Sequence, residues 1–171
     1  MKRGWLARAV ASVSARHSCP APAAASVRAY PCMYPAWKAL VPLCREQPHV
    51  MRAGAPPGSQ HPPGLPRHWA TDMFLATAAN DAQRSAEALA AVRALRASPV
   101  AASTTVSLLA ATAEYNQRSY DAALQAFETL MDEEPAMLDG VDVYSNILYV
   151  HEGVEQLSLL ARRAMSIDRY R

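Results

Sequence analysis

Histidine, glutamate and cysteine are the residues of this chain whose chemistry could support a metal site or a nucleophile. His151 and Glu152 are adjacent, so on a helix their side chains would point about 100° apart and could not hold one metal ion together. The three cysteines, Cys19, Cys32 and Cys44, form no CxxC pair and have no histidine at zinc-ligand spacing. Their odd number argues against a disulfide framework. We therefore predict reduced thiols, no metal ion and no cofactor.

Sequence motifs of enzyme active sites are also missing. The chain has no phosphate-binding GxxxxGK[ST] loop, no GxSxG nucleophile elbow and no HExxH zinc motif. No nucleophile is paired with a general base, as a helical hydrolase or transferase would require. The sequence therefore predicts a protein that is not an enzyme and has no small-molecule substrate.

Charge and proline content divide the chain near residue 70. Residues 1–70 hold nine basic residues and one acidic residue, a net charge of +8, whereas residues 71–171 hold eight arginines and fourteen acidic residues, a net charge of −6. Eleven of the 13 prolines precede residue 71, and proline lacks the amide donor that regular helices and strands need. We predict a disordered, basic, Pro-rich segment over residues 1–70 and a helical region over residues 71–171.

The basic segment allows several interpretations. Its start, MKRGWLARAVASVSARHSC, has four basic residues and no acidic one, and residues 1–50 are transit-like, which favours a mitochondrial or plastid address. The alternatives are a disordered tail, or upstream sequence joined wrongly to the gene. Residues 54–68, GAPPGSQHPPGLPRH, are typical of a linker. No apolar run approaches the ~20 residues of a membrane-spanning helix, so no membrane partner is expected.

Apolar residues after position 71 recur at helical spacing. Between Tyr120 and Met131 they fall at offsets 0, 3, 4, 7, 10 and 11, which is one continuous stripe on a helix. Pro135 ends that helix, and Ser119 is its predicted N-cap. A helix over residues 104–115 precedes it across a short polar turn, so the two must pack antiparallel. Asp139 is the predicted N-cap of a later helix that ends at Val150.

The same helix pair recurs with a fixed period. A weaker pair covers residues 72–80 and 85–96, and a third covers residues 139–150 and 154–165, with Gly153 at the turn between them. Corresponding positions in the second helices are 34 or 35 residues apart, which is the tetratricopeptide signature. They are Ala88, Ala123 and Leu157; Val92, Phe127 and Ala161; and Leu95, Leu130 and Ala164. We predict an all-α, tetratricopeptide-like solenoid of hairpins over residues 71–100, 104–135 and 139–171.

Four segments give a closer resemblance. They are YDAALQAFETLMDEEP at residues 120–135, DVYSNILY at 142–149, LSLLA at 157–161 and DRYR at 168–171. In order and spacing they resemble the subunit 8 family of the anaphase-promoting complex, or cyclosome, and the resemblance covers about residues 104–171. It implies a non-catalytic scaffold of a cell-cycle ubiquitin ligase, located in the nucleus and cytoplasm, in which another subunit transfers ubiquitin.

Family members are several times longer, so the resemblance also implies that this chain is a fragment or a mis-predicted gene model. The family's groove for activator peptides lies in later repeats and is not assigned to this chain. The expected partners are other subunits of the complex, with a homodimer as a further prediction.

The repeat pattern and the resemblance select residues for packing between repeats or for a subunit interface. For Tyr144 and Tyr149 we favour packing between hairpins, because both fall in the apolar stripe. The full set is Ala111, Tyr120, Ala123, Phe127, Pro135, Tyr144, Asn146, Leu148, Tyr149, Leu157, Leu160, Ala161 and Tyr170.

Two other functions fit parts of the sequence. An organellar pentatricopeptide-type RNA-binding protein would explain the 35-residue spacing and the transit-like start, but the charge of −6 makes nucleic acid an unfavourable partner. A generic tetratricopeptide adaptor that binds peptides is the other alternative. The acidic residues 132–134 are predicted to be a solvated helix end, although acids are unfavourable at the carboxyl end of a helix.

Overall fold

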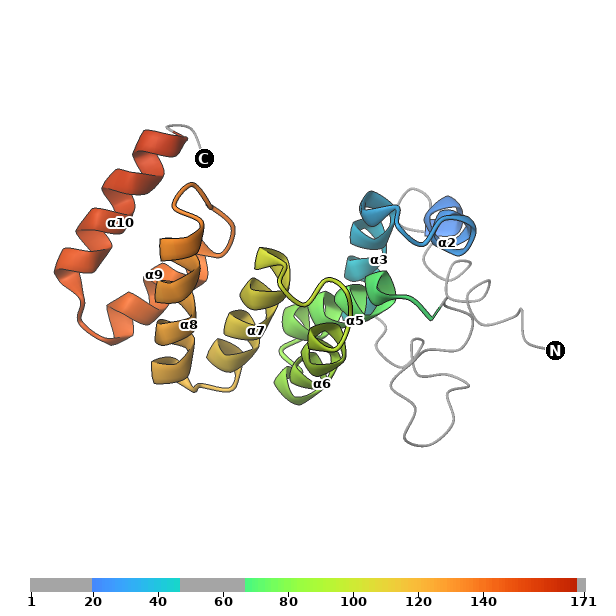
Figure 1. Cartoon of the computed structure of the whole chain (residues 1–171), viewed down its shortest axis with the longest axis horizontal. Coiled ribbons are helices and arrows are strands. Elements are labelled where there is room, and N and C mark those ends of the chain that lie inside the picture. Colours follow the sequence, from blue (N-terminus) through green and yellow to red (C-terminus); the bar gives the residue numbers. More distant parts are fainter. Residues whose placement is uncertain (1–19, 47–66, 169–171) are drawn as a thin grey trace.

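The computed structural model describes residues 20–46 and 67–168, with side chains described over residues 25–42 and 67–168. These residues form four antiparallel helical hairpins in a row (Figure 1). The hairpins are α2 (Pro20–Ala29) with α3 (Tyr34–Glu46), α5 (Trp69–Asp81) with α6 (Ser85–Arg96), α7 (Thr104–Asn116) with α8 (Tyr120–Glu133), and α9 (Val141–Val150) with α10 (Val154–Ile167). The predicted all-α, tetratricopeptide-like architecture is confirmed.

The hairpin of α2 and α3 corrects the expectation of disorder for residues 20–46. Pro35 stands in the first turn of α3, where no amide donor is needed. Trp37 is 1% exposed, and its ring centroid lies 5.0 Å from that of Phe74 in α5. The core therefore continues across the boundary that composition placed near residue 70. Residues 1–19 and 47–66, with the transit-like start and most of the linker, lie outside the described residues.

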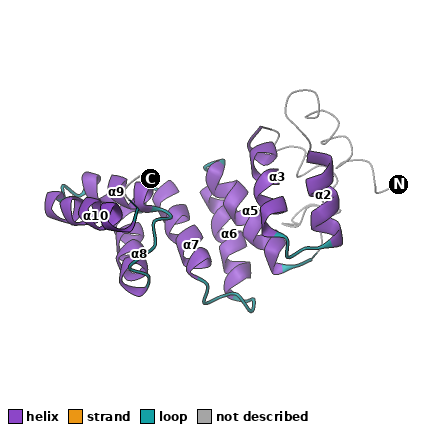
Figure 2. Cartoon of the chain, turned by 90° about the horizontal axis from the view of Figure 1, so that it is seen from above, coloured by secondary structure: helices purple, strands orange, loops and turns teal. Residues whose placement is uncertain are grey.

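The first helices of the last three hairpins contact one another. α5 packs on α7 and α7 packs on α9, while the second helices α6, α8 and α10 make no comparable contact with each other. Each second helix instead packs on the first helix of the next hairpin, α6 on α7 and α8 on α9 (Figure 2). Since the first helices lie closer together, they form the inner side of the curved row.

Buried amides tie the inner helices together. Asn80, at the end of α5, is 7% exposed, and its Nδ2 donates to the Leu109 carbonyl oxygen of α7 at 3.0 Å. In return, Asn116 Nδ2 donates to the Asn80 carbonyl oxygen at 3.2 Å. Such bonds satisfy polar groups that would be costly to bury alone. Next to them, Ala79, Ala88 and Ala113 are each at most 3% exposed and form a small cluster between α5, α6 and α7.

The turns inside three hairpins are equivalent. Gln83, Arg118 and Glu152 have φ of 54°, 63° and 57° and lie 35 and 34 residues apart. The amide directly after each of these residues donates to the carbonyl five residues before it, for example Gly153 N to the Leu148 carbonyl at 2.9 Å. This is the Schellman pattern. Glu152, and not Gly153, therefore takes the left-handed conformation; Gly153 has φ −76° and is the N-cap of α10.

The longest described helices, α8 and α10, have 14 residues each. At 1.5 Å per residue such a helix is roughly 21 Å long, below the ~30 Å of a bilayer core. Within the described part of the chain, no helix is long and apolar enough to span a membrane.

Candidate protein-interaction surface

Phe127 is the centre of the core that joins the last two hairpins. It is fully buried, and its ring stacks on Tyr144 with centroids 5.6 Å apart and planes 19° apart. This core contains six of the residues selected from the sequence: Ala111, Ala123, Phe127, Tyr144, Leu148 and Leu160. Buried aromatic pairs of this kind add about 0.5–1.5 kcal/mol beyond the area they bury.

Gly140 sets the start of α9 against this core. It is the N-cap residue and has φ +80°, whereas Asp139 was predicted to cap the helix. A Cβ at position 140 would lie 2.5 Å from Leu108 Cδ1 and 3.1 Å from Phe127 Cε1. Glycine is therefore required twice over here, by the left-handed backbone and by the lack of space. Ser119 does occupy the N-cap position of α8, but its side chain makes no capping hydrogen bond.

The phenol of Tyr144 lies among charged groups of two neighbouring helices. Burial raises its pKa above the ordinary value of 10.0, and the carboxylates of Glu128 and Asp132 raise that pKa further. The guanidinium of Arg163 in α10 acts in the opposite direction. The pKa of Tyr144 therefore depends on how α8 and α10 are placed around α9.

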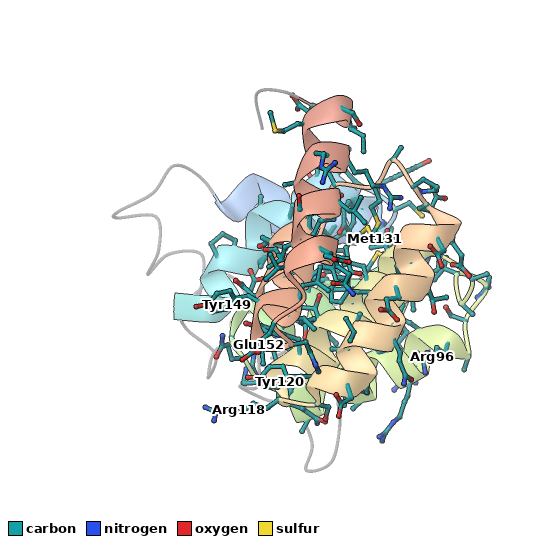
Figure 3. All side chains as sticks on the ribbon, turned by 90° about the vertical axis from the view of Figure 1, so that its left-hand side faces the viewer. Arg96, Arg118, Tyr120, Met131, Tyr149 and Glu152 are labelled. Carbon is teal, nitrogen blue, oxygen red and sulfur yellow. The ribbon has the colours of Figure 1, made fainter. Side chains whose placement is uncertain are left out.

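The remaining selected residues are not among the buried members of this core, although Leu157 packs against it. Tyr120 and Leu157 are half-buried, Pro135, Asn146, Tyr149 and Ala161 are exposed, and Tyr170 lies outside the described residues. Tyr149 is 76% exposed, so the preference for packing between hairpins is wrong for this tyrosine. It stands near the end of α9, on the side that no further helix of the described chain covers (Figure 3).

Large apolar side chains are exposed on the last hairpin. We call them the α9–α10 apolar surface: Tyr149, Val150, Val154, Leu159, Met165 and Ile167, between 41% and 76% exposed. A groove at one end of it is lined by Tyr149, Val150, Glu152, Val154 and Leu157. Large apolar side chains that gather exposed on one hairpin are candidates for protein–protein contact.

The repeat shows that the apolar stripe of α10 is less covered than those of α6 and α8. In α6 the corresponding residues Ala88, Val92 and Leu95 are buried, and in α8 Ala123, Phe127 and Leu130 are buried. In α10, Leu157 and Ala164 are half-buried and Ala161 is exposed. The regular offsets predicted equal burial for all three second helices. Periodicity could not reveal the difference, because it identifies the apolar stripe of a helix but not whether a neighbour covers it.

Polar residues gather at the neighbouring turn without forming a metal site. His151 is the C-cap of α9, and its Nε2 lies 3.7 Å from Asp121 Oδ1. At the other end of the molecule, Cys32 Sγ lies 3.8 Å from His68 Nε2. Neither pair has a third donor, and no group of three metal-ligating side chains occurs among the described residues.

Comparison with known proteins identifies relatives of the chain. It is similar to anaphase-promoting complex subunit 8 from Dictyostelium discoideum, with 35% identity over 145 residues, which is 85% of this chain and 23% of the relative. The subunit 8 of Arabidopsis thaliana is 30% identical over 146 residues, again 85% of this chain and 23% of the relative. The human cell division cycle protein 23 homolog is 34% identical over 103 residues, 60% of this chain and 17% of the relative. No protein-family model matches the chain.

The chain is therefore homologous to a segment of anaphase-promoting complex subunit 8, the family that its motifs indicated. It spans about a quarter of the length of the subunit 8 relatives it matches. A match of 145 residues in a chain of 171 must begin at or before residue 27. The similarity is thus wider than residues 104–171 and includes α3. A targeting sequence over residues 1–50 is not supported, because much of that range belongs to the homologous segment.

Proposed function

We propose that this chain is a non-catalytic scaffold segment of an anaphase-promoting complex, a ubiquitin ligase of the cell cycle, and that it acts by binding neighbouring subunits through its helical hairpins. The nucleus and cytoplasm are the proposed location. The homology to subunit 8 supports the assignment. The observation that carries the mode of action is the partly open face of α10, where positions that α6 and α8 bury are half-buried or exposed.

The chemistry of this face suits another protein. Three exposed charged residues, Glu152, Glu155 and Arg162, lie on the same hairpin as the α9–α10 apolar surface. Protein–protein interfaces usually combine apolar and charged side chains in this way. Each earlier second helix already packs an amphipathic helix on the equivalent face, α7 on α6 and α9 on α8. A neighbouring subunit that presents an amphipathic helix is therefore the proposed partner.

Affinity purification tests the proposal. The full chain, tagged and expressed in dividing cells, should recover known subunits of the anaphase-promoting complex. The triple variant Val154→Ser, Leu159→Ser, Met165→Ser removes apolar area from the surface and should lose most of that recovery while keeping wild-type helical circular dichroism. A control with exposed residues of α8 changed, Gln125→Ser and Thr129→Ser, should recover the subunits as the wild type does.

Two outcomes would contradict the proposal. If no subunit of the complex is recovered with the wild-type chain, the assignment to the complex fails. If the triple variant recovers the subunits as well as the control does, the assignment survives but the α9–α10 apolar surface is not the contact.

A further inference from the structure

The carbonyl of Met131 is one of the last four of α8, which have no partner inside the helix. The residue four positions later, whose amide could otherwise reach this carbonyl, is Pro135, which has no amide hydrogen. Met131 as a residue is 4% exposed, and the surroundings of its carbonyl oxygen are partly buried. The last turn of α8 also has no basic residue and ends at Glu133, with Glu134 as the C-cap, so both acids lie at the negative end of the macrodipole.

Arg163 supplies what this helix end lacks. From α10, its Nη2 donates to the Met131 carbonyl oxygen at 2.7 Å, and its Nε donates to the Pro135 carbonyl oxygen at 2.6 Å. The two bonds hold the planar guanidinium in one orientation, and its charge lies at the negative end of α8. The unfavourable acids at the end of α8 are thereby offset by a cation from another hairpin.

This bridge distinguishes the last hairpin from the earlier ones. The residue equivalent to Arg163 is Thr129 in α8 and Ala94 in α6, by the spacings of 34 and 35 residues. The Thr129 hydroxyl bonds within its own helix, to the Gln125 carbonyl, and alanine has no side-chain donor. The neighbouring Arg162 also bonds within its own helix, to Ser158.

We infer that Arg163 is a positioning residue that fixes the orientation of the α9–α10 hairpin on α8, and so the direction in which the α9–α10 apolar surface points. Second helices are otherwise held apart in this fold, since α8 and α10 have no packing comparable to that of α8 on α9. The two hydrogen bonds from Arg163, one to the end of α8 and one to the loop that follows it, restrict rotation of α10 about the α9 turn. The inference holds whichever protein covers the surface.

Distance measurements on the full chain test this role. Spin labels on genetically encoded amino acids at the exposed positions 125 in α8 and 155 in α10 report the angle between the helices, and the native cysteines stay in place. The wild type and Arg162→Met, the matched control, should give the same narrow distance distribution. Arg163→Met, which keeps an apolar stem but no donor, should give a broader and shifted distribution. Equal distributions for the two methionine variants would overturn the inference.

A second variant covers the case in which Arg163→Met loses its helical circular dichroism. Pro135→Ala restores an amide donor to the Met131 carbonyl, so it should recover the fold of Arg163→Met without restoring the bridge to α10. In this background, a broad distribution with Arg163→Met and a narrow one with Arg162→Met would support the inference. Narrow distributions with both variants would overturn it.

Discussion

The helices α8 and α10 have the same length and the same kind of apolar stripe, yet they differ in burial. α8 buries Ala123, Phe127, Leu130 and Met131, whereas α10 buries Leu160 alone among its residues. The difference comes from the neighbours, because α8 lies between α7 and α9 while α10 contacts the chain on one side. An amphipathic stripe therefore indicates which face of a helix can be buried. Whether that face is buried depends on the presence of a neighbouring hairpin.

The largest expected effect is a difference in the free energy of unfolding between a mutation in α8 and one in α10. Phe127→Ala should reduce the free energy of unfolding by about 3–5 kcal/mol, because it leaves a cavity between Tyr144 and the start of α9. Met165→Ala, on the exposed face of α10, should change it by no more than about 0.5 kcal/mol. Urea unfolding followed by circular dichroism measures both. Comparable losses at the two positions would mean that α10 is covered in the isolated chain.

A smaller effect on the free energy of unfolding is expected from pH, and it arises at the buried Tyr144. The pKa of Tyr144 is raised above 10.0 in the folded chain, so above about pH 10 the unfolded state releases this proton first. Stability should therefore fall as pH rises from about 10 through the folded pKa, and be fully present below pH 10. Tyr144→Phe should reduce this fall, measured as the free energy of unfolding between pH 8 and 11. If Tyr144→Phe loses stability over this range as steeply as the wild type does, the interpretation is wrong.

The smallest effect tests what the hairpins have in common. Gln83, Arg118 and Glu152 each hold a left-handed backbone, which costs a non-glycine residue roughly 1–2 kcal/mol, while glycine has an entropy cost of about 0.5–1 kcal/mol. Replacing each by glycine should thus raise the midpoint of thermal unfolding slightly, by a similar amount at all three turns. A loss of stability at any one of them would show that its side chain makes a contact that outweighs the backbone strain.

The helical region was predictable from sequence because its signals are local. The offsets from Tyr120 to Met131 and the stop at Pro135 predicted a helix that the structure places at Tyr120–Glu133. The spacing of 34–35 residues predicted the hairpins, and it also recurs in the left-handed turn residues, which were not anticipated. These turns are defined by two backbone amides that bond to carbonyls at the end of each helix, so they depend on backbone geometry and not on residue type.

The misses came from interactions that are distant in sequence or position-dependent. Counting prolines over residues 1–70 ignored that Pro35 stands where a helix tolerates it. Asp139 is a good capping residue by type, but the space beside Leu108 and Phe127 requires Gly140 at that position. The acids at the end of α8 had no explanation within the helix, because the compensating charge of Arg163 comes from 28 residues beyond Pro135.

The alanine cluster Ala79, Ala88 and Ala113 has a consequence for the shape of the whole row. At this point α5, α6 and α7 meet through three alanine methyl groups, with Leu89 packed against them, and the distance between packed helices depends on the side chains at their contact. A bulkier residue here would increase the distance between neighbouring hairpins and change the position and angle of every later hairpin in the solenoid. The curvature of the solenoid thus depends on some of its smallest side chains, far from the surface that it orients.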